Sequence, residues 1–441
     1  MSETLERLKG SLLGGSKSNG GQPSSLRTIR TKPEFHDISK FAEYKEFETT
    51  EWFYGKQKFE WNLFREHLGV SGAEVSIDGR QMINFSSYNY LDLAGDKRVL
   101  DAAKEAIDNY GVSTGSGRMI TGEIPIHQEF EHELCDMFGS EEAVVSVGGY
   151  STNAFTIGYI ARKQDLIIYD ELIHNSALVG SKISGARRLT FPHNDIEALD
   201  DLLKEHRNKY ERVLVLIEGV YSMDGDIPDV PRTIEVAKRH KALIMVDEAH
   251  SIGVIGPRGL GVLDYFPELK ASDIDMLFGS MSKSFATCGG YVAGARPVIS
   301  ILKHYAPGVL LYGASPTPAN TAAGLASLRI MRSEPERALK LQSNAAYFIE
   351  KAQAAGLDTG MSADSGVVPI MIGSSEQALW LSVKLFESNI CTYPMMFPVV
   401  PRGEARLRFF VNCAHTVEQI DHTVEKLTAL LKEVPRDRGL F

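Results

Sequence analysis

The sequence predicts an α/β fold in which a large, mainly parallel sheet is followed by a smaller α/β unit. From Glu142 to about Val292, short apolar runs alternate with stretches long enough to form helices. Alternation at this spacing is typical of parallel strands joined by helices that cover both faces of a sheet. After Gly294 the chain favours helices, and from Met361 it predicts a smaller α/β unit that ends in a helix near residues 417–433.

The apolar runs expected as strands of the large sheet lie at residues 143–147, 166–169, 188–191, 212–218, 242–246 and 276–279. Helices are expected between them at residues 153–162, 196–206 and 230–240. Upstream, residues 75–85 predict two short strands joined by an Asp78-Gly79 turn, because Asp-Gly favours a tight hairpin. A helix is expected at residues 97–110.

The chain is expected to divide into successive parts. Residues 1–33 are predicted to be flexible, because they contain a Gly/Ser-rich segment with the composition of a linker. Residues 34–90 are expected to form an N-terminal arm and strands of the smaller domain. Residues 91–330 then make the large domain, and residues 331–441 make the C-terminal small domain.

The composition narrows the class of protein. With 441 residues and 43% hydrophobic residues, the chain is long enough to bury a large core, and its net charge of −10 argues against nucleic-acid binding. The four cysteines are scattered without a C-x-x-C pair, which fits a reducing compartment and predicts no metal site. Because no apolar run is long enough to cross a membrane and the N-terminus lacks a signal core, a cytoplasmic location is expected, with a peripheral membrane contact left open.

Lys283 lies in a loop whose composition suits one particular cofactor. Ser280, Ser282 and Ser284 surround the lysine. A lysine amine can condense with an aldehyde, and neighbouring hydroxyls can bind a phosphate. Pyridoxal phosphate carries both groups. On its own, however, the segment equally fits a solvated lysine in a Ser/Gly loop.

Asp247 supports the interpretation that the Lys283 loop binds pyridoxal phosphate. The apolar run at residues 242–246 ends abruptly in Asp247, and His250 follows three positions later. A buried parallel strand places ligand groups at its carboxyl end, where a carboxylate is costly without a cationic partner. A protonated pyridine nitrogen at ~4 Å would contribute roughly 4 kcal/mol at an effective dielectric of ~20. A helix cap or a metal ligand are the other interpretations of Asp247.

Eight motifs then occur in order: Ser86-Ser-Tyr-Asn-Tyr-Leu91, Ser113-Thr-Gly-Ser-Gly-Arg118, Gly148-Gly-Tyr-Ser-Thr-Asn153, His174-Asn-Ser176, Glu218-Gly-Val-Tyr-Ser-Met-Asp-Gly-Asp226, Val246-Asp-Glu-Ala-His250, Ser282-Lys283 and Ala405-Arg-Leu-Arg408. From about Phe85 to His422 the chain therefore resembles the α-oxoamine synthases, a branch of the fold-type I pyridoxal-phosphate enzymes. That branch includes serine palmitoyltransferase, 8-amino-7-oxononanoate synthase, 5-aminolevulinate synthase and 2-amino-3-ketobutyrate CoA ligase.

The resemblance implies a fold-type I transferase that uses pyridoxal 5'-phosphate and no metal. Lys283 would carry the cofactor as a Schiff base, and Asp247 would face the ring nitrogen. His174 would stack on the ring, and His250 would lie near the phenolic oxygen and the thioester carbonyl. These four residues form the implied catalytic set.

The resemblance implies further cofactor contacts for residues that stand at matching positions of the family motifs. Gly149 and Tyr150 would offer backbone N–H groups to the phosphate at the start of a helix. Ser222 would lie near the phenolic oxygen. Ser280 stands where the family has a threonine and keeps a hydroxyl for the phosphate.

The chain departs from the family pattern in two places. The family often has a serine or threonine that reaches the partner subunit's phosphate where this chain has Gly313; either Ser315 compensates or the contact is absent. The segment Met395–Gly403 is similar to the ketobutyrate ligase, and Met396 stands about where serine palmitoyltransferase has an additional arginine.

The amino-acid substrate is expected to meet Arg408, because arginine binds carboxylates with two parallel hydrogen bonds. The resemblance implies that Tyr88 and Asn89 contact the substrate. The tyrosine at position 88 is similar to the residue in serine palmitoyltransferase, whereas other relatives often have asparagine at this position. Arg402 and Arg406 are interpreted as surface charges.

The implied reaction is a decarboxylative condensation of an amino acid with an acyl thioester, giving an α-amino ketone, in a homodimer. Serine with a long-chain thioester is favoured, as in sphingolipid or other lipid biosynthesis. Glycine or alanine, and coenzyme A or a carrier protein, stay open. The alternatives are activity of the ketobutyrate ligase or oxononanoate synthase type, an aminotransferase, and a noncatalytic partner subunit, which would lack the lysine.

The segment from residue 35 to residue 68 is crowded with aromatic side chains. The favoured interpretation is an arm that packs on the body or across a dimer, and the alternative is a wall or lid for a long acyl chain. Aromatic rings supply a large apolar area for either use.

Overall fold

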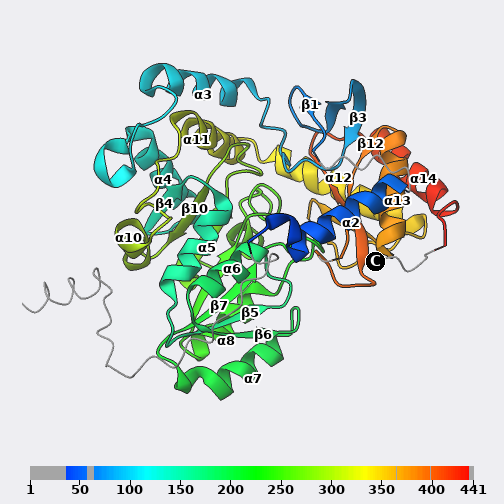
Figure 1. Ribbon diagram of the computed structural model, residues 1–441. Coiled ribbons are helices and arrows are strands. Elements are labelled where there is room, and N and C mark those ends of the chain that lie inside the picture. Colours follow the sequence, from blue (N-terminus) through cyan, green and yellow to red (C-terminus); the bar gives the residue numbers. More distant parts are fainter. Residues whose placement is uncertain (1–35, 57–63, 364, 398, 437–441) are drawn as a thin grey trace, which may run out of the picture. The chain divides into compact units, whose positions relative to one another are not determined.

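The computed structural model describes residues 36–56, 64–363, 365–397 and 399–436 (Figure 1). The chain divides into two compact units, Met1–Leu63 and Phe64–Phe441. The first contains the short helix η2 (Ile38–Lys40) and the helix α2 (Ala42–Lys56). The predicted flexible segment lies outside the described residues, as do residues 57–63 of the aromatic arm, and the role of that arm stays a prediction.

The large sheet of the second unit has the strand order β4-β10-β9-β8-β7-β5-β6. Its strands are β4 (Glu142–Ser146), β5 (Leu166–Asp170), β6 (Arg187–Phe191), β7 (Val213–Glu218), β8 (Leu243–Asp247), β9 (Met276–Ser280) and β10 (Gly290–Gly294). The pairings from β9 through β6 are parallel, whereas β10 is antiparallel to both its neighbours. The predicted fold class is confirmed. Strand β10 was not predicted, because its glycine-rich sequence lacks a long apolar run.

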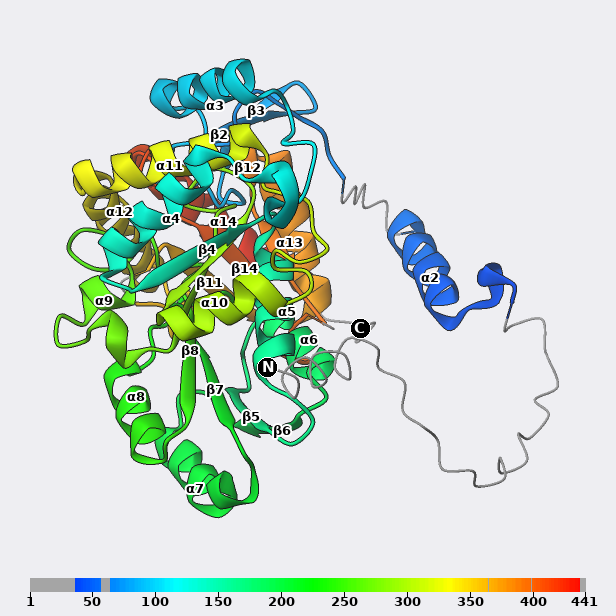
Figure 2. The same cartoon turned by 90° about the vertical axis from the view of Figure 1, so that its left-hand side faces the viewer.

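Side chains of the central strands alternate between two hydrophobic cores. On β7, Val215 and Ile217 belong to one core, while Leu214 and Leu216 belong to the other. A strand buried on both faces needs apolar residues at nearly every position, which explains the continuous apolar runs. Figure 2 shows β7 and β8 side by side in the interior of the unit.

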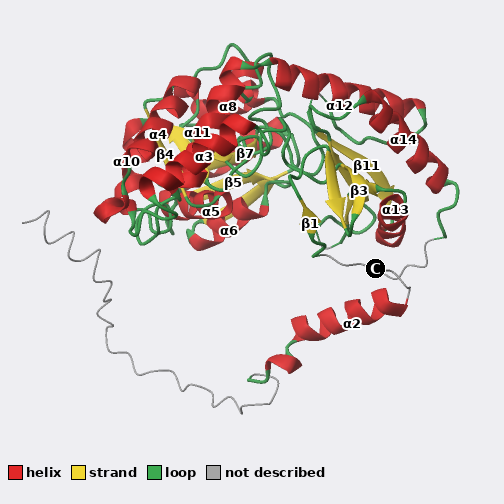
Figure 3. Ribbon diagram, turned by 90° about the horizontal axis from the view of Figure 1, so that it is seen from above, coloured by secondary structure: helices red, strands yellow, loops and turns green. Residues whose placement is uncertain are grey.

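Helices cover both faces of this sheet (Figure 3). One core contains residues of α5 (Gly149–Ile160), α6 (Asn175–Ile183) and α10 (Arg296–Tyr305). The other contains residues of α3 (Lys97–Tyr110), α4 (Pro125–Phe138), α7 (Ile196–His206), α8 (Val230–Arg239) and α11 (Pro318–Ser333). The helices predicted at residues 97–110 and 196–206 are confirmed at both ends.

Two smaller sheets complete the second unit. One joins β1 (His67–Leu68), β2 (Glu74–Ile77), β3 (Arg80–Asn84) and β12 (Ile390–Cys391), and the other joins β11 (Val367–Gly373), β14 (Ala405–Phe410) and β13 (Tyr393–Met395). The nearby helices are α12 (Glu336–Ala354), α13 (Ser375–Glu387) and α14 (Val417–Leu431). The predicted hairpin is confirmed, with positive φ at Asp78 (52°) and Gly79 (75°), as a two-residue turn of this kind requires.

No helix among the described residues combines the length and the apolar character needed to cross a bilayer.

Candidate active site

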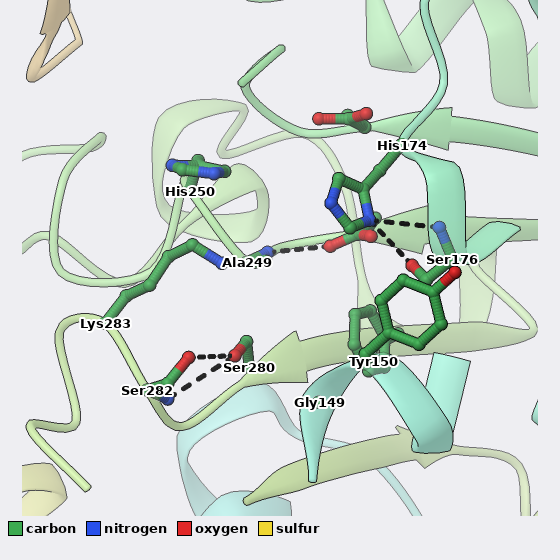
Figure 4. Close-up of a pocket in the computed structure, with 12 residues that line it drawn as sticks. Gly149, Tyr150, His174, Ser176, Ala249, His250, Ser280, Ser282 and Lys283 are labelled. Atoms are coloured by element: carbon green, nitrogen blue, oxygen red, sulfur yellow. Dashed lines mark hydrogen bonds between the residues drawn. The ribbon is translucent and has the colours of Figure 1, made fainter. Parts of the chain in front are cut away.

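One pocket collects most of the predicted site residues at the carboxyl ends of β7, β8 and β9 (Figure 4). This is the edge of a parallel sheet at which open α/β folds bind ligands. The pocket is lined by Gly149, Tyr150, His174, Ser176, Glu218, Asp247, Ala249, His250, Phe278, Ser280, Ser282 and Lys283. The structure therefore brings Lys283 and Asp247 into the same cavity.

Asp247 is a buried carboxylate at the last position of β8. Asn153 Nδ2 donates to its Oδ2 at 2.9 Å, and the backbone N–H of Ala249 donates to its Oδ1 at 2.9 Å. Burial raises the pKa of Asp247 to about 6, although these two donors and Lys283 act in the opposite direction. A cation placed against the carboxylate in the pocket would lower that pKa again and stabilise the charged form.

Glu218 is a pocket residue that sequence reasoning left without a role. It ends β7 directly opposite Asp247 in the strand register. Its Oε2 accepts from the backbone N–H of Ser222 at 3.2 Å, and its Oε1 is buried with no hydrogen-bond partner among the described residues. Burial, followed by the neighbouring Asp247, raises the pKa of Glu218 well above its usual value. The signal was available, because the run at 213–217 also ends in an acid.

Lys283 follows β9 and lines the pocket as a half-buried residue. Burial lowers its pKa, while Asp247 and Glu218 raise it. Its Nζ lies 5.7 Å from the centre of the Tyr88 ring. A lysine amine whose pKa is lowered by burial has a larger neutral fraction, and the neutral amine is the nucleophile.

His174 and His250 are both neutral. His174 caps the N-terminus of α6, where its Nδ1 accepts from the backbone N–H of Ser176 at 3.3 Å. Burial, together with the charges of Lys283 and Arg408, lowers the pKa of His174 to about 4 and that of His250 well below its usual value. Two uncharged imidazoles therefore face a pocket that already contains a lysine.

The start of helix α5 forms an anion cradle beside Lys283. A Cβ at Gly149 would lie 2.6 Å from Ser280 Oγ and 3.4 Å from Gly289 O, so only glycine fits. Ser280 Oγ lies 2.8 Å from Ser282 Oγ. Tyr150 also lines the pocket, and its hydroxyl donates to Asn175 Oδ1 at 2.6 Å. Backbone N–H groups at a helix start and nearby hydroxyls fit a phosphate.

Arg408 comes from β14 in the three-stranded sheet and is buried near the pocket. Its Nη1 donates to the backbone carbonyl of Ser222 at 2.8 Å, and its guanidinium lies 4.5 Å from the centre of the Phe410 ring. Its Nε is buried without a partner among the described residues. Tyr88 packs edge-on against Phe410 at 4.8 Å and against His250 at 6.1 Å.

Two predicted site residues hydrogen-bond to backbone groups of this chain. The amide of Asn89 is fully used within the protein: its Oδ1 accepts from Leu93 N and Ala94 N, and its Nδ2 donates to Ser71 O and Asp92 Oδ1. Asn89 therefore has no free donor or acceptor for a substrate, because an amide offers two of each.

Ser315 is held by backbone groups of its own chain. Its buried hydroxyl contacts Ser116 O at 2.8 Å and Gly122 O at 2.9 Å, so its single proton lies between two carbonyls. A contact from Ser315 to the partner subunit's phosphate, in place of the residue that the family has at Gly313, stays a prediction. Ser222 contributes backbone contacts to Glu218 and Arg408, and a contact from its hydroxyl stays a prediction.

A buried ionic cluster supports the turn that carries Ser222. His193 Nδ1 donates to Asp170 Oδ1 at 2.9 Å, and its Nε2 donates to Asp226 Oδ2 at 3.0 Å. Burial opposes the charge, but the two carboxylates outweigh it and raise the pKa of His193 to about 10. Arg406 is buried in an ion pair with Asp224 in the same turn, so its interpretation as a surface charge was wrong.

Replacing His193 with glutamine is expected to destabilise the protein by roughly 3–5 kcal/mol at pH 6, because two buried carboxylates lose their cation. The folded-state pKa of about 10 lies above the unfolded value of ~6.5. The stabilisation by charged His193 is therefore complete below pH ~6.5 and is lost as the pH rises through 10. Urea unfolding of native and variant protein at pH 6, 8 and 10 measures the difference, which should shrink with pH.

A difference that stays constant from pH 6 to 10 would contradict this assignment of charge. His304→Gln, at an exposed histidine whose Nδ1 contacts Ser300 O and which forms no ion pair among the described residues, is the matched control. It is expected to change the free energy of unfolding by no more than about 0.5 kcal/mol.

The comparisons with known proteins agree with this geometry. The family model "Aminotransferase class I and II" matches residues 80–427. The 8-amino-7-oxononanoate synthase of Coprothermobacter proteolyticus is 36% identical over 82% of this chain and 91% of that protein. The serine palmitoyltransferase of Sphingobacterium spiritivorum is 35% identical over 86% of this chain and 94% of that protein.

A solved structure with a similar fold is serine palmitoyltransferase from S. paucimobilis with a bound pyridoxal-phosphate–myriocin aldimine. It superposes with a TM-score of 0.84 at 30% identity and covers 89% of this chain and 98% of that one.

Proposed function

We propose that this chain, which belongs to the aminotransferase class I and II family and to its pyridoxal-phosphate-dependent α-oxoamine synthase branch, joins an amino acid to an acyl thioester with loss of carbon dioxide. The observation that carries the proposal is the pocket in which Lys283, Asp247 and the Gly149 cradle meet. An amine, a buried carboxylate and an anion site are the groups that this cofactor needs from a protein.

The residues present fit the cofactor. Asp247 would hold the ring nitrogen, because its buried carboxylate has hydrogen-bond donors but, within the described part of the chain, no cation in direct contact. Lys283 would hold the aldehyde, and the N–H groups at Gly149 with the hydroxyl of Ser280 would hold the phosphate. His174 would offer the flat face of a neutral ring. When bound, the cofactor supplies an electron sink for a carbanion on the amino acid.

Arg408 is the residue proposed to bind the carboxylate of the amino acid. It is charged, buried and fixed through the carbonyl of Ser222, and its Nε has no partner among the described residues. A guanidinium in that state offers a carboxylate charge-assisted hydrogen bonds. The substrate would then lie between this arginine and Lys283.

Lys283 and His250 are proposed to move and hold protons during the reaction. A lysine amine whose pKa is lowered by burial can accept the proton from the α-carbon of the amino acid. A neutral imidazole at His250 can donate a hydrogen bond to the thioester carbonyl as negative charge develops on it.

The favoured substrates are serine and a long-chain acyl thioester, as proposed for a serine palmitoyltransferase-like enzyme. The likeness to the S. paucimobilis enzyme and the tyrosine at position 88 support this choice. A second candidate is activity of the 8-amino-7-oxononanoate synthase type, with a different amino acid, which the 36% identity to that enzyme supports equally.

A noncatalytic subunit is the alternative of another class, and the presence of Lys283 in the pocket argues against it. We propose a homodimer in the cytoplasm. Large apolar side chains at Val112, Ile120 and Tyr312 are 75–83% exposed in the single chain, which supports a subunit interface in this part of the surface.

Replacing Lys283 with alanine is expected to abolish turnover and the visible absorption of the purified protein, because the amine that holds the cofactor's aldehyde is lost. Borohydride treatment and digestion should place a pyridoxyl group on the peptide that contains Lys283 in native protein. The exposed Lys104→Ala variant should keep both properties. A label on another peptide would contradict the role of Lys283.

The Arg408→Ala variant is expected to raise the KM for the amino acid by about 10- to 100-fold, the equivalent of a lost charge-assisted hydrogen bond. The KM for the thioester should change little, because the carboxylate that Arg408 is proposed to bind belongs to the amino acid and not to the thioester. Arg402→Ala, at an exposed arginine, is the control. Equal increases for both substrates would argue against carboxylate binding by Arg408.

The substrates can be identified by pairing glycine, alanine and serine with acyl thioesters of increasing length, and measuring the mass of the product. Serine with a long-chain thioester is expected to give the highest kcat/KM, with release of carbon dioxide. Formation of a keto acid without a thioester would instead indicate an aminotransferase.

A further inference from the structure

Tyr90 is a fully buried tyrosine whose hydroxyl reaches the pocket residue His250. The phenol oxygen lies 2.8 Å from His250 Nδ1. The backbone of Tyr90 is fixed by hydrogen bonds to Tyr88 O and from Cys413 N, and its ring packs edge-on against Phe410 at 5.9 Å. The hydroxyl therefore has one position, directed at the imidazole.

The protons on this pair can be counted. Burial raises the pKa of Tyr90 well above its usual value and lowers that of His250 well below, so the phenol and the imidazole are both neutral. A neutral imidazole carries one proton, on either Nδ1 or Nε2, and a phenol carries one. The contact between Tyr90 and His250 accommodates only one of these protons.

Only one arrangement satisfies both groups. If His250 Nδ1 carried the proton and donated to the phenol oxygen, the Tyr90 proton would have no acceptor among the described residues, and an unpaired buried donor is costly. If Tyr90 donates to Nδ1, every proton at the contact is used. The imidazole proton then lies on Nε2, which has no protein partner among the described residues.

We infer that Tyr90 is a positioning residue that fixes His250 in the tautomer protonated at Nε2, so that the imidazole presents a hydrogen-bond donor to the pocket. His250 lines the pocket together with Lys283, as Figure 4 shows. A donor held in place before the reaction stabilises an oxygen on which negative charge develops, without reorganisation at that moment. This catalytic consequence rests on the proposed function, whereas the tautomer itself does not.

The test uses protein labelled with ¹⁵N at histidine, in its pyridoxal-phosphate-loaded form, since protonated and unprotonated ring nitrogens give separate NMR signals. The His250→Gln variant identifies the signals of His250 by their loss. Native protein is expected to show a protonated Nε2 and an unprotonated Nδ1. A proton on Nδ1 would overturn the inference, whatever the enzyme's substrates prove to be.

The Tyr90→Phe variant keeps the ring and removes the donor. Its His250 signals are expected to shift toward a mixture of tautomers, and kcat of the condensation to fall roughly 10-fold with little change in either KM, the equivalent of one hydrogen bond. Unchanged His250 signals in this variant would overturn the inference. If the native protein shows the expected tautomer but forms no α-amino ketone, the proposed function fails and the positioning by Tyr90 stands.

Tyr291→Phe is the matched control. Tyr291 is also fully buried, but its hydroxyl has no hydrogen-bond partner among the described residues, and it is not a pocket residue. Its removal is expected to leave the His250 signals and kcat unchanged. A change equal to that of Tyr90→Phe would show that loss of any buried hydroxyl disturbs the site, and would overturn the specific role of Tyr90.

Discussion

The site depends on the buried carboxylate of Asp247, which has no cation in direct contact among the residues that the structure describes. Asp247 ends a central strand of the large sheet and has Asn153 and a backbone N–H as its hydrogen-bond partners. Taking a carboxylate out of water is costly unless a positive charge joins it. Protonation of the cofactor's pyridine nitrogen would supply such a positive charge. The buried carboxylate of Asp247 therefore favours the protonated form of the ring.

Burial sets the charge of the neighbouring groups in the same way. Glu218 lies opposite Asp247, and burial together with that neighbouring acid raises its pKa well above the usual value. Desolvation at the pocket, together with the charges of Lys283 and Arg408, lowers the pKa values of His174 and His250 and favours their neutral forms. A neutral imidazole has one acceptor and one donor nitrogen, and the hydrogen-bond partners of each ring determine which nitrogen carries the proton. The partner is the Ser176 N–H at His174, and we infer that it is the Tyr90 hydroxyl at His250.

The turn at residues 221–226 connects the large sheet to the three-stranded sheet. The backbone of Ser222 contacts Glu218 on one side and Arg408 on the other, while Asp224 pairs with Arg406. His193 holds the end of the turn through Asp226. Because Arg408 is fixed to this turn, the proposed position of the amino-acid carboxylate depends on an ionic cluster that contacts no substrate.

The sequence by itself determined the parallel sheet, its main helices and the approach of Lys283 to Asp247. Strands buried on both faces need continuous apolar runs, and the acid that interrupts such a run marks the ligand edge of the sheet. The glycine-rich β10 escaped prediction because its apolar run, Tyr291 to Ala293, is only three residues long and lies between two glycines, although these residues are buried in the cores.

Only the tertiary structure decided which polar residues are free to act. Asn89 belongs to a motif of the family, but its side-chain oxygen accepts from the backbone N–H groups of Leu93 and Ala94. Tyr90 lies in the same motif as Asn89 and reaches His250, which is 160 positions away in the chain. A hydrogen bond satisfied across such a separation leaves no periodic pattern in the sequence, because it depends on how distant loops meet and not on local spacing.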